Sequence, residues 1–301
     1  MSDYSGIILA GGDGTRLSAL TRRLAGDDRP KQFCRLIGDE TLLEQTRRRA
    51  RLLVPPERLL TVVTRHHEGF YLPALADAEP RSIVAQPGNR GTAPAILYAL
   101  LRLAHVAPAG PVVMLPSDHY VSDDEAFMAR VEGALETVEA RPEAVVLLGI
   151  APDRPEVEYG WIEPAELILA ASPWPVYRVR RFWEKPSLPV AQRLERAGCL
   201  WNSFVIVAQP SSLEALIRRA TPELDDAFAP IRARLGTPWE DDAARGVYGR
   251  LPAFDLSRHV LQSSAQSLAV LPVSGVGWND LGDAARVLAI REQIGWQLAS
   301  A

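Results

Sequence analysis

The chain has 301 residues, of which 47% are hydrophobic and 23% charged, and this composition excludes a disordered, fibrous or collagen-like protein. The 33 Lys and Arg residues against 37 Asp and Glu residues give a net charge of −4, which argues against a protein that coats nucleic acid. Only two cysteines occur, and the sequence shows neither the order of a signal peptide nor an apolar run of about 20 residues. We therefore predict a cytoplasmic protein without nucleic-acid or membrane partners.

Apolar runs rich in β-branched residues alternate with helix-like segments in the first half of the chain. Strands are expected at 6–10, 59–63, 82–85, 111–115 and 144–150, and helices at 92–106, 126–139 and directly after Thr41. Thr41 and Glu44 have the spacing of a capping box, which satisfies free amides at a helix start. Continuous apolar strands separated by helices predict an α/β fold with a mostly parallel, Rossmann-like sheet and helices on both faces. Ligands of such sheets bind beyond the carboxyl ends of the strands.

After about residue 150 the pattern becomes mixed. Strands at 159–163, 176–183 and 201–208, joined by proline-rich loops, predict a mixed β lobe laid over the sheet. A further strand is expected at 267–273 and a terminal helix at 284–296. We divide the chain into segments of about 1–150, 151–282 and 283–301 within a single domain.

A glycine-rich turn, LAGGDGTR at 9–16, follows the first predicted strand. Its three glycines let backbone amides approach an anion closely, so the turn is a candidate phosphate cradle. It is not a P-loop, because no Gly-Lys-Ser/Thr follows, and it lacks the dinucleotide fingerprint, because Leu17 stands in place of the third glycine.

Lysine is rare in this chain: Lys31 and Lys185 are the only lysines among its 33 cationic residues. A lysine ammonium is a compact point charge that the planar fork of arginine does not reproduce, so both lysines are candidates for functional sites. Lys31, in PKQF at 30–33, could fold with Arg16 over a triphosphate. Lys185, in RFWEKP at 181–186, could neutralise a substrate phosphate while Glu184 accepts hydrogen bonds from hydroxyl groups. The alternative for Lys185 is an ordinary surface ion pair.

Two aspartates follow predicted strands that lie far apart in the sequence. Asp118 in LPSDH and Asp280 in GWNDLG could share a Mg²⁺ ion, which takes carboxylate and phosphate oxygens. The alternative is that each caps a helix or turn. His66 and His67 are adjacent, so on a helix they would diverge, and we do not expect them to bind zinc. The arginines at 47–49 are expected on a solvated helix face.

Taken in order, eight motifs resemble the sugar-phosphate nucleotidylyltransferase family. They are LAGGDGTR at 9–16, PKQF at 30–33, NRGTAPAI at 89–96, LPSDH at 115–119, YGWIE at 159–163, FWEKP at 182–186, WNS at 201–203 and GWNDLG at 277–282. PKQF and TAPAI point to the mannose-1-phosphate branch of this family, and the match covers nearly the whole chain.

The resemblance implies the nucleotide-diphospho-sugar transferase fold and nucleotidyl transfer, with Mg²⁺ as cofactor, from a nucleoside triphosphate such as GTP to a hexose 1-phosphate such as mannose 1-phosphate. The first segment would then bind the nucleotide and the second the sugar phosphate. Implied nucleotide-binding residues are Leu9, Ala10, Gly11, Gly12, Gly14, Thr15, Gln86, Asn89, Thr92 and Ser117; sugar-phosphate-binding residues are Gly160, Glu184, Lys185 and Asn202; metal ligands are Asp118 and Asp280; and catalytic residues are Arg16, Lys31 and Lys185.

Departures from the family pattern leave alternatives open. The base-side loop reads GNRGTAP at 88–94, and Phe204 follows WNS where the family usually has glycine. Another base or hexose 1-phosphate, such as glucose 1-phosphate, therefore remains an alternative, as does a non-catalytic regulatory relative that binds sugar nucleotides. A metal-dependent glycosyltransferase ranks last, because the chain has Ser117-Asp-His119 where an Asp-x-Asp motif would be expected. We expect no isomerase or β-helical domain after Asp280, and a homodimer remains open.

Overall fold

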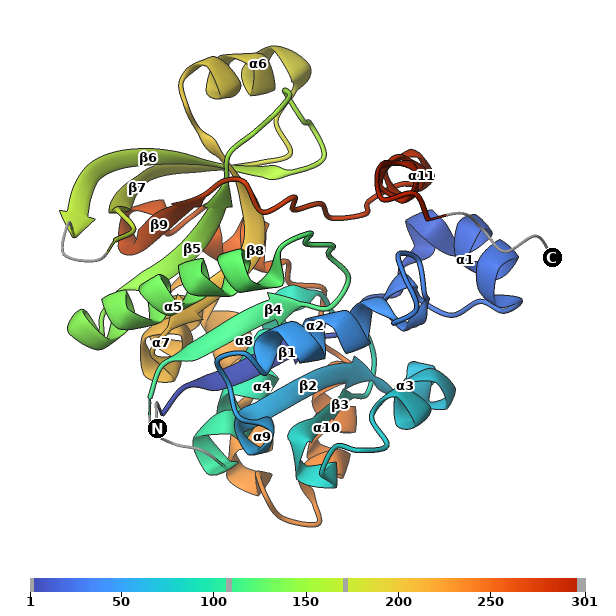
Figure 1. The fold of residues 1–301 in the computed structure, drawn as a ribbon. Helices are drawn as coiled ribbons and strands as arrows, with labels where there is room; N and C mark the ends of the chain where they lie inside the picture. The colour runs from blue at the N-terminus through green and yellow to red at the C-terminus, as the bar shows by residue number, and fades with distance from the viewer. Residues whose placement is uncertain (1–2, 107–109, 170–172, 297–301) are drawn as a thin grey trace.

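The computed structural model describes residues 3–106, 110–169 and 173–296. One nine-stranded sheet runs through these residues (Figure 1). From edge to edge its strands are β3 (Ile83–Gln86), β2 (Leu59–Thr64), β1 (Ser5–Leu9), β4 (Val112–Pro116), β8 (Leu200–Ala208), β5 (Val145–Ile150), β9 (Leu268–Val273), β7 (Val176–Glu184) and β6 (Gly160–Leu169). None of the described helices is long and apolar enough to cross a membrane.

The sheet joins a parallel part to a mixed part. Strands β1 to β4 pair in parallel, and so do β5 and β9. Strand β8 lies antiparallel between β4 and β5 and thereby ties the two parts together. Strands β6 and β7 pair antiparallel to each other and extend this same sheet, with β7 on β9 and β6 also on β8. The predicted lobe therefore continues the sheet instead of lying over it.

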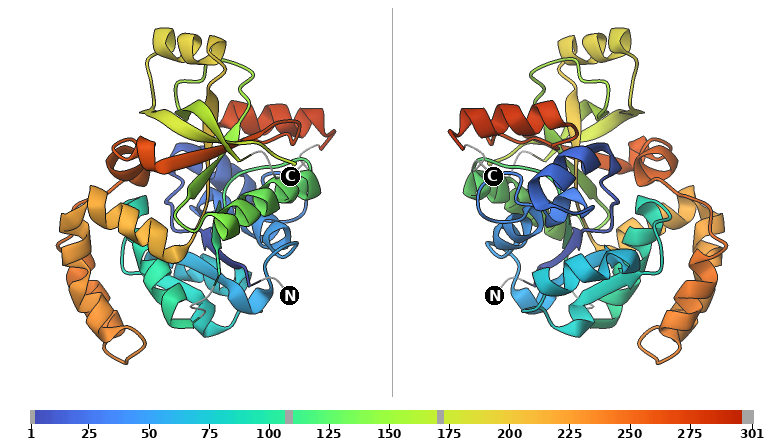
Figure 2. Two further views of the ribbon diagram at one scale, coloured as in Figure 1. Left: turned by 90° about the vertical axis from the view of Figure 1, so that its left-hand side faces the viewer. Right: turned by 90° about the vertical axis from the view of Figure 1, so that its right-hand side faces the viewer.

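Helices cover both faces of the sheet, as the alternation of strands and helices predicted. Helices α2 (Leu42–Ala50) and α5 (Asp124–Ala140) lie on one face, and α4 (Thr92–Val106) and α7 (Pro210–Ala220) on the other (Figures 1 and 2). The remaining helices are α1 (Ser18–Ala25), α3 (Glu68–Ala74), α6 (Leu188–Arg196), α8 (Pro222–Ala227), α9 (Ala229–Arg234), α10 (Glu240–Tyr248) and α11 (Ala284–Gln293).

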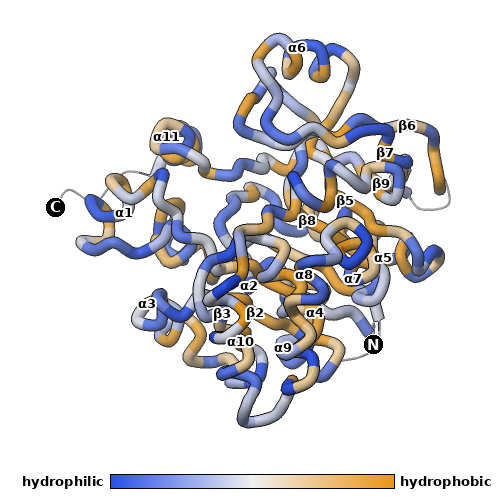
Figure 3. Tube along the Cα trace, turned by 180° about the vertical axis from the view of Figure 1, so that it is seen from behind, coloured by the Kyte–Doolittle hydropathy of each residue, from blue (hydrophilic) through white to orange (hydrophobic). Residues whose placement is uncertain are grey.

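Two large apolar clusters form the core, one on each face of the sheet. Successive strand residues point to opposite faces, so Ile7 and Val62 belong to the cluster beneath α4 and α7, whereas Ile8 and Val63 belong to the cluster beneath α2 and α5. The hydropathy of the chain follows this arrangement, because the hydrophobic residues gather along the central strands and the helix faces that meet them (Figure 3).

The predicted capping box of α2 is confirmed, whereas α5 begins at Asp124, two residues before its predicted start. The Thr41 hydroxyl accepts a hydrogen bond from the Glu44 amide (3.2 Å), while the Glu44 carboxylate accepts one from the Thr41 amide (2.6 Å). Asp123 caps α5 by accepting a hydrogen bond from the Ala126 amide (2.9 Å). Helix α11 ends at Gln293, three residues before the predicted end, and 297–301 lie outside the described residues.

The prediction of a solvated arginine cluster at 47–49 is wrong. Only 3% of Arg49 is exposed, and its Nε donates to Asp124 at 2.5 Å. Arg47 is also buried and pairs with Asp77 at 2.7 Å, whereas Arg48 is exposed. Each of the two buried arginines has a carboxylate partner that compensates for its buried charge, and both partners lie far along the chain.

A third, smaller apolar cluster joins segments near both ends of the chain. Leu17, Leu36, Leu281, Val287 and Ile290 are buried together in it. Helix α11 thereby packs beside the segment that contains α1, on the right-hand side of the molecule in Figure 1. The residues that follow β1 are therefore held in place by residues that follow β9.

Candidate active site

A cleft of about 430 Å³ opens at the carboxyl ends of the parallel strands. The sequence-predicted residues that line it are Leu9, Gly11, Gly12, Arg16, Gln86, Asn89, Thr92, Asp118, Gly160, Glu184, Asn202, Phe204 and Asp280. Four further predicted residues are adjacent in sequence to lining residues, namely Ala10, Thr15, Ser117 and Lys185. Lys31 contacts the lining residues Asp118 and Asp280, whereas Gly14 lies two positions from the nearest lining residues and does not itself line the cleft. The sheet thus brings motifs from both predicted halves to one cleft, as expected for a sheet whose parallel strands end on the same side.

The glycine-rich turn after β1 is shaped by two polar side chains that sequence reasoning missed. Gln32 Nε2 donates to the carbonyl oxygens of Ala10 (3.0 Å) and Gly12 (2.8 Å), and Thr64 Oγ1 donates to that of Gly11 (2.7 Å). These bonds turn three successive carbonyl groups toward the protein. Since carbonyl oxygens repel phosphate oxygens, this arrangement favours an anion above the turn.

Two glycines of the turn are required by geometry. A Cβ atom on Gly11 would lie 2.7 Å from Gln86 Nε2, and Gly14 has a φ of +62° with Lys31 N only 3.0 Å from its Cβ position. Gly12 has open space above it, so a ligand can approach its backbone. Ser117 Oγ donates to the Leu9 carbonyl at 2.7 Å and therefore fixes the turn from the β4 side.

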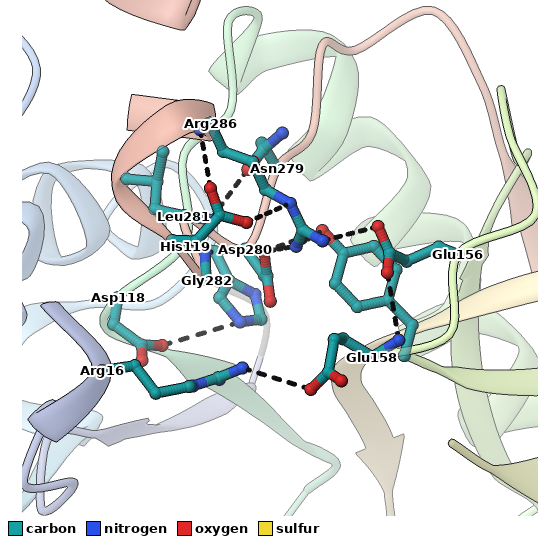
Figure 4. A network of polar contacts seen from close by, with 12 residues as sticks. Arg16, Asp118, His119, Glu156, Glu158, Asn279, Asp280, Leu281, Gly282 and Arg286 are labelled. Atoms are coloured by element: carbon teal, nitrogen blue, oxygen red, sulfur yellow. Dashed lines mark hydrogen bonds and ion pairs between the residues drawn. The ribbon is translucent and has the colours of Figure 1, made fainter. Parts of the chain in front are cut away.

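Asp118 and Asp280 both line the cleft, as the strand-end argument predicted, and Figure 4 shows them in one region with His119. Asp280 Oδ1 accepts hydrogen bonds from Tyr159 Oη (2.7 Å), Arg286 (2.7 Å) and the Gly282 amide (2.8 Å). Burial alone would raise the pKa of both aspartates, but His119, Lys31 and, for Asp280, Arg286 outweigh burial and lower it. Both groups are therefore carboxylates at neutral pH.

Lys31 lies against these two acidic residues. Its Nζ is 3.2 Å from Asp118 Oδ2 and donates to the backbone oxygens of Asp280 (2.6 Å) and Leu281 (3.3 Å). Only 7% of Lys31 is exposed. Its ammonium thus joins the ends of β4 and β9, and the structure places it beside the carboxylates instead of over the glycine-rich turn.

The Glu158 carboxylate lies between Arg16 and Lys185, the two other cationic residues that the sequence analysis predicted to bind phosphate. Glu158 Oε2 lies 3.7 Å from an Arg16 nitrogen and 3.5 Å from Lys185 Nζ. The contact between Glu158 and Arg16 is visible in Figure 4. Arg16 and Lys185, assigned by resemblance to different phosphates, therefore converge on one negative group. No local pattern in the sequence indicates this role for Glu158.

Neutralising Glu158 tests whether it competes with bound phosphates. We expect Glu158→Gln to lower the KM of the phosphate-bearing substrates about two- to fivefold with little change in kcat, because half-exposed ion pairs contribute at most about 1 kcal/mol. Steady-state kinetics measure this effect. Asp153→Asn is the control, since Asp153 pairs with Arg154 and has no contact with the two cations. A raised KM would show instead that Glu158 positions Arg16 and Lys185.

The far end of the cleft contains Gly160, Glu184, Asn202 and Phe204. A Cβ on Gly160 would lie 2.9 Å from Phe182 and 3.2 Å from Glu184 Oε2, so glycine keeps the space beside this carboxylate open. Burial and the nearby Asp255 raise the pKa of Glu184. Such a group accepts hydrogen bonds in its charged form and can also donate one when protonated.

Three non-glycine residues with strained backbone line the cleft or directly follow residues that line it. Across the described ranges, the non-glycine residues with positive φ are Lys185 (45°), Phe204 (60°) and Leu281 (49°). Each costs on the order of 1 kcal/mol or more, and such residues tend to cluster at functional sites. Lys185 directly follows Glu184, and Leu281 directly follows Asp280. Glycine adopts a positive φ without strain, so the backbone conformation at Phe204 explains why the family usually has glycine at this position.

The sequence matches the model of the family described as nucleotidyl transferase over residues 5–295. The chain belongs to this family. The match confirms the resemblance inferred from the motifs, and it extends over both parts of the sheet and over α11. The glycine-rich turn, the two carboxylates and the cations described above therefore lie within the region that matches the family.

Among curated relatives, the chain is 32% identical to the xanthan biosynthesis protein XanB of Xanthomonas campestris pv. campestris, over 98% of this chain and 61% of that protein. It is 30% identical to the mannose-1-phosphate guanylyltransferase of Escherichia coli K12, over 92% of this chain and 57% of that protein. The chain thus spans about three fifths of the length of these relatives.

Solved structures support the same fold. A crystal structure described as mannose-1-phosphate geranyltransferase from Thermus thermophilus superposes with a TM-score of 0.80 at 33% identity, covering 95% of this chain and 79% of that one. UDP-glucose pyrophosphorylase complexed with UDP-glucose has a TM-score of 0.60 at 13% identity, covering 98% and 99% of the two chains. The similarity to UDP-glucose pyrophosphorylase supports a shared fold and no statement about substrates.

Proposed function

We propose that this protein transfers a nucleotidyl group from a nucleoside triphosphate to the phosphate of a hexose 1-phosphate and releases pyrophosphate. The observation that carries the proposal is the convergence of Arg16 and Lys185 on Glu158, beside the paired carboxylates Asp118 and Asp280. Two cations and two acidic metal-ligand candidates suit a reaction between two phosphate-bearing substrates. We further propose GTP and mannose 1-phosphate as substrates, on the strength of the PKQF and TAPAI motifs and the similarity to the E. coli guanylyltransferase.

The reaction forms one P–O bond and breaks another. A phosphate oxygen of the hexose 1-phosphate attacks the α-phosphorus, the bond from the α-phosphorus to the bridging oxygen breaks, and pyrophosphate takes the electron pair. No covalent enzyme intermediate is needed. The protein therefore contributes positioning and charge neutralisation: the turn at Gly11 and Gly12 receives the triphosphate, Arg16 neutralises it, and Lys185 holds the sugar phosphate.

The carboxylates suit a magnesium ion. Asp118 and Asp280 both have lowered pKa values, and ionised carboxylate oxygens are ligands that Mg²⁺ prefers. The three hydrogen bonds described for the Asp280 side chain all go to Oδ1, which leaves Oδ2 for a metal. We propose that these two residues hold Mg²⁺, which would neutralise phosphate charge. Lys31 would keep the two strand ends at a fixed separation.

The first experiment measures pyrophosphate release with Mg²⁺ across a grid of nucleoside triphosphates and hexose 1-phosphates. We expect maximal release with GTP and mannose 1-phosphate. Release only with another pair would overturn the proposed substrates but keep the reaction class. Binding of sugar nucleotide without release anywhere in the grid would overturn the enzyme proposal and indicate a regulatory binding protein.

Phe204 is expected to limit the size of the accepted sugar. It lines the cleft next to Asn202, whose side-chain oxygen accepts a hydrogen bond from the Phe204 amide at 3.0 Å. We expect Phe204→Gly, which suits the positive φ, to raise kcat/KM for an N-acetylhexosamine 1-phosphate relative to mannose 1-phosphate at least about tenfold, within the range for steric discrimination in pockets. Phe204→Tyr, which retains the ring, serves as control. An unchanged ratio in the glycine variant would show that Phe204 does not restrict the sugar.

A further inference from the structure

Three potential metal ligands gather at the rim of the cleft, away from Asp118 and Asp280. Asp13 belongs to the glycine-rich turn after β1, and His66 and His67 belong to the 3-10 turn Arg65–His67 directly after β2. Their ligand atoms all lie within 4.8 Å of one another. The sequence analysis expected the two histidines to diverge, but their ring centroids are 3.8 Å apart, because both side chains reach the same carboxylate.

The distances fit a small tetrahedral ion. Asp13 Oδ1 lies 2.9 Å from His66 Nε2 and 3.6 Å from His67 Nε2. In a tetrahedral zinc site with metal–ligand distances of about 2.0–2.1 Å, neighbouring ligand atoms lie about 3.3 Å apart. These two distances lie on either side of this value, and all three ligand atoms lie within 4.8 Å of one another, so side-chain movements would have to draw them together around an ion.

His67 offers a ring nitrogen that a metal ion could take. It is 5% exposed and its buried Nδ1 has no hydrogen-bond partner, whereas Nε2 is on the side of Asp13 and makes no hydrogen bond within the described residues. Its Nε2 faces Asp13 at a distance too long for a hydrogen bond. A metal ion on Nε2 would therefore break no hydrogen bond of His67 that the structure shows.

We propose that Asp13, His66 and His67 bind a divalent transition-metal ion of the zinc class, at a site separate from the magnesium site proposed above. Imidazole nitrogens favour Zn²⁺, Co²⁺ and Ni²⁺, whereas Mg²⁺ favours oxygen ligands. Three protein ligands leave a fourth position for water or another small ligand. The inference is independent of the proposed reaction, since it rests on the geometry of these three residues.

The position of the site gives the bound ion an effect on the cleft. Asn89, which lines the cleft, donates from Nδ2 to Asp13 Oδ2 at 2.8 Å, and Arg16 follows Asp13 by three residues. An ion on Asp13 would therefore connect the turns after β1 and β2 with the loop after β3. It would restrict the movement of the turn that carries Arg16.

The test measures metal binding directly by the purified full chain in excess Mg²⁺. We expect one equivalent of Co²⁺ to produce the visible absorption of a tetrahedral complex and one equivalent of Zn²⁺ to abolish it. His66→Gln and His67→Gln should each weaken Zn²⁺ binding at least about 100-fold, measured by competition with a chromophoric chelator. His105→Gln is the matched control, because His105 is exposed and distant in sequence from the cluster.

The variants distinguish loss of the metal site from loss of the fold. His66 is exposed, so His66→Gln tests the site without disturbing the core, and thermal melting checks the fold of His67→Gln. Loss of the Co²⁺ spectrum in both variants, with retention in His105→Gln, supports the proposal. Absence of tetrahedral binding in the natural chain, or equal binding by all variants, overturns it. None of these measurements requires catalytic activity, so they remain valid if the proposed reaction fails.

Discussion

Asp118→Asn is expected to reduce kcat at least about 1,000-fold with little change in fold. Asparagine keeps the shape of the side chain but removes the negative charge that lies 3.2 Å from Lys31 Nζ and that would hold Mg²⁺. A metal ion that stabilises charge in the transition state contributes several kcal/mol, and each 1.36 kcal/mol corresponds to a tenfold change in rate. Pyrophosphate release over a range of Mg²⁺ concentrations measures the loss, which we expect high Mg²⁺ to restore only in part.

Asp123→Asn provides the matched control for this experiment. Asp123 lies five residues away and caps α5 by accepting a hydrogen bond from the Ala126 amide, a role that asparagine also performs. The control should therefore keep normal activity and normal dependence on Mg²⁺. Full activity of Asp118→Asn would refute the assignment of Asp118 as a metal ligand.

Lys185→Arg is expected to reduce kcat/KM for the hexose 1-phosphate about 100-fold, although it conserves charge. Lys185 sits at a φ of 45° directly after Glu184, and its Nζ already lies 3.5 Å from Glu158. The larger planar guanidinium cannot occupy the position of a compact ammonium, and loss of one aligned donor at a reacting charge typically costs 100- to 1,000-fold. Kinetics with the sugar phosphate as the varied substrate measure the effect.

The reverse exchange on β7, the strand that directly precedes Lys185, serves as the control. Arg180 is exposed and pairs with Glu163 at 3.4 Å, so Arg180→Lys should leave kcat/KM unchanged. Near-normal turnover of Lys185→Arg would show that any cation suffices at this position. The argument from the scarcity of lysine would then no longer apply to Lys185.

Features that depend on local pattern were predictable from the sequence. The alternation of apolar strands and helices predicted the parallel part of the sheet, and the positions of Asp118 and Asp280 after strands predicted that they share a cleft. The capping box of Thr41 and Glu44 depends on two residues that are three positions apart. Phe204 stands where the family usually has glycine, which indicated an altered sugar-binding part of the cleft. The positive φ of Phe204 explains in structural terms why glycine is usual there.

Features that depend on distant partners were not predictable. Gln32 and Thr64 shape the glycine-rich turn through bonds to backbone oxygens, which leave no pattern in the sequence. Arg49 is adjacent to two other arginines and looks solvated until Asp124, 75 residues later, is placed beside it. The scarcity of lysine marked Lys31 as important, but nothing local showed that its acceptors would be the backbone oxygens of Asp280 and Leu281.

The bond from Lys31 to Asp280 also determines when the site can form during synthesis. The two residues are 249 positions apart, so Lys31 leaves the ribosome long before its acceptors exist. The turn after β1 can meet its own neighbours early, but the carboxylate pair is completed only when β9 and the segment after it have been made. A nascent chain that ends before Asp280 therefore lacks one of the two carboxylates and both backbone acceptors of Lys31, and closing contacts so distant in sequence costs more conformational entropy than closing local ones.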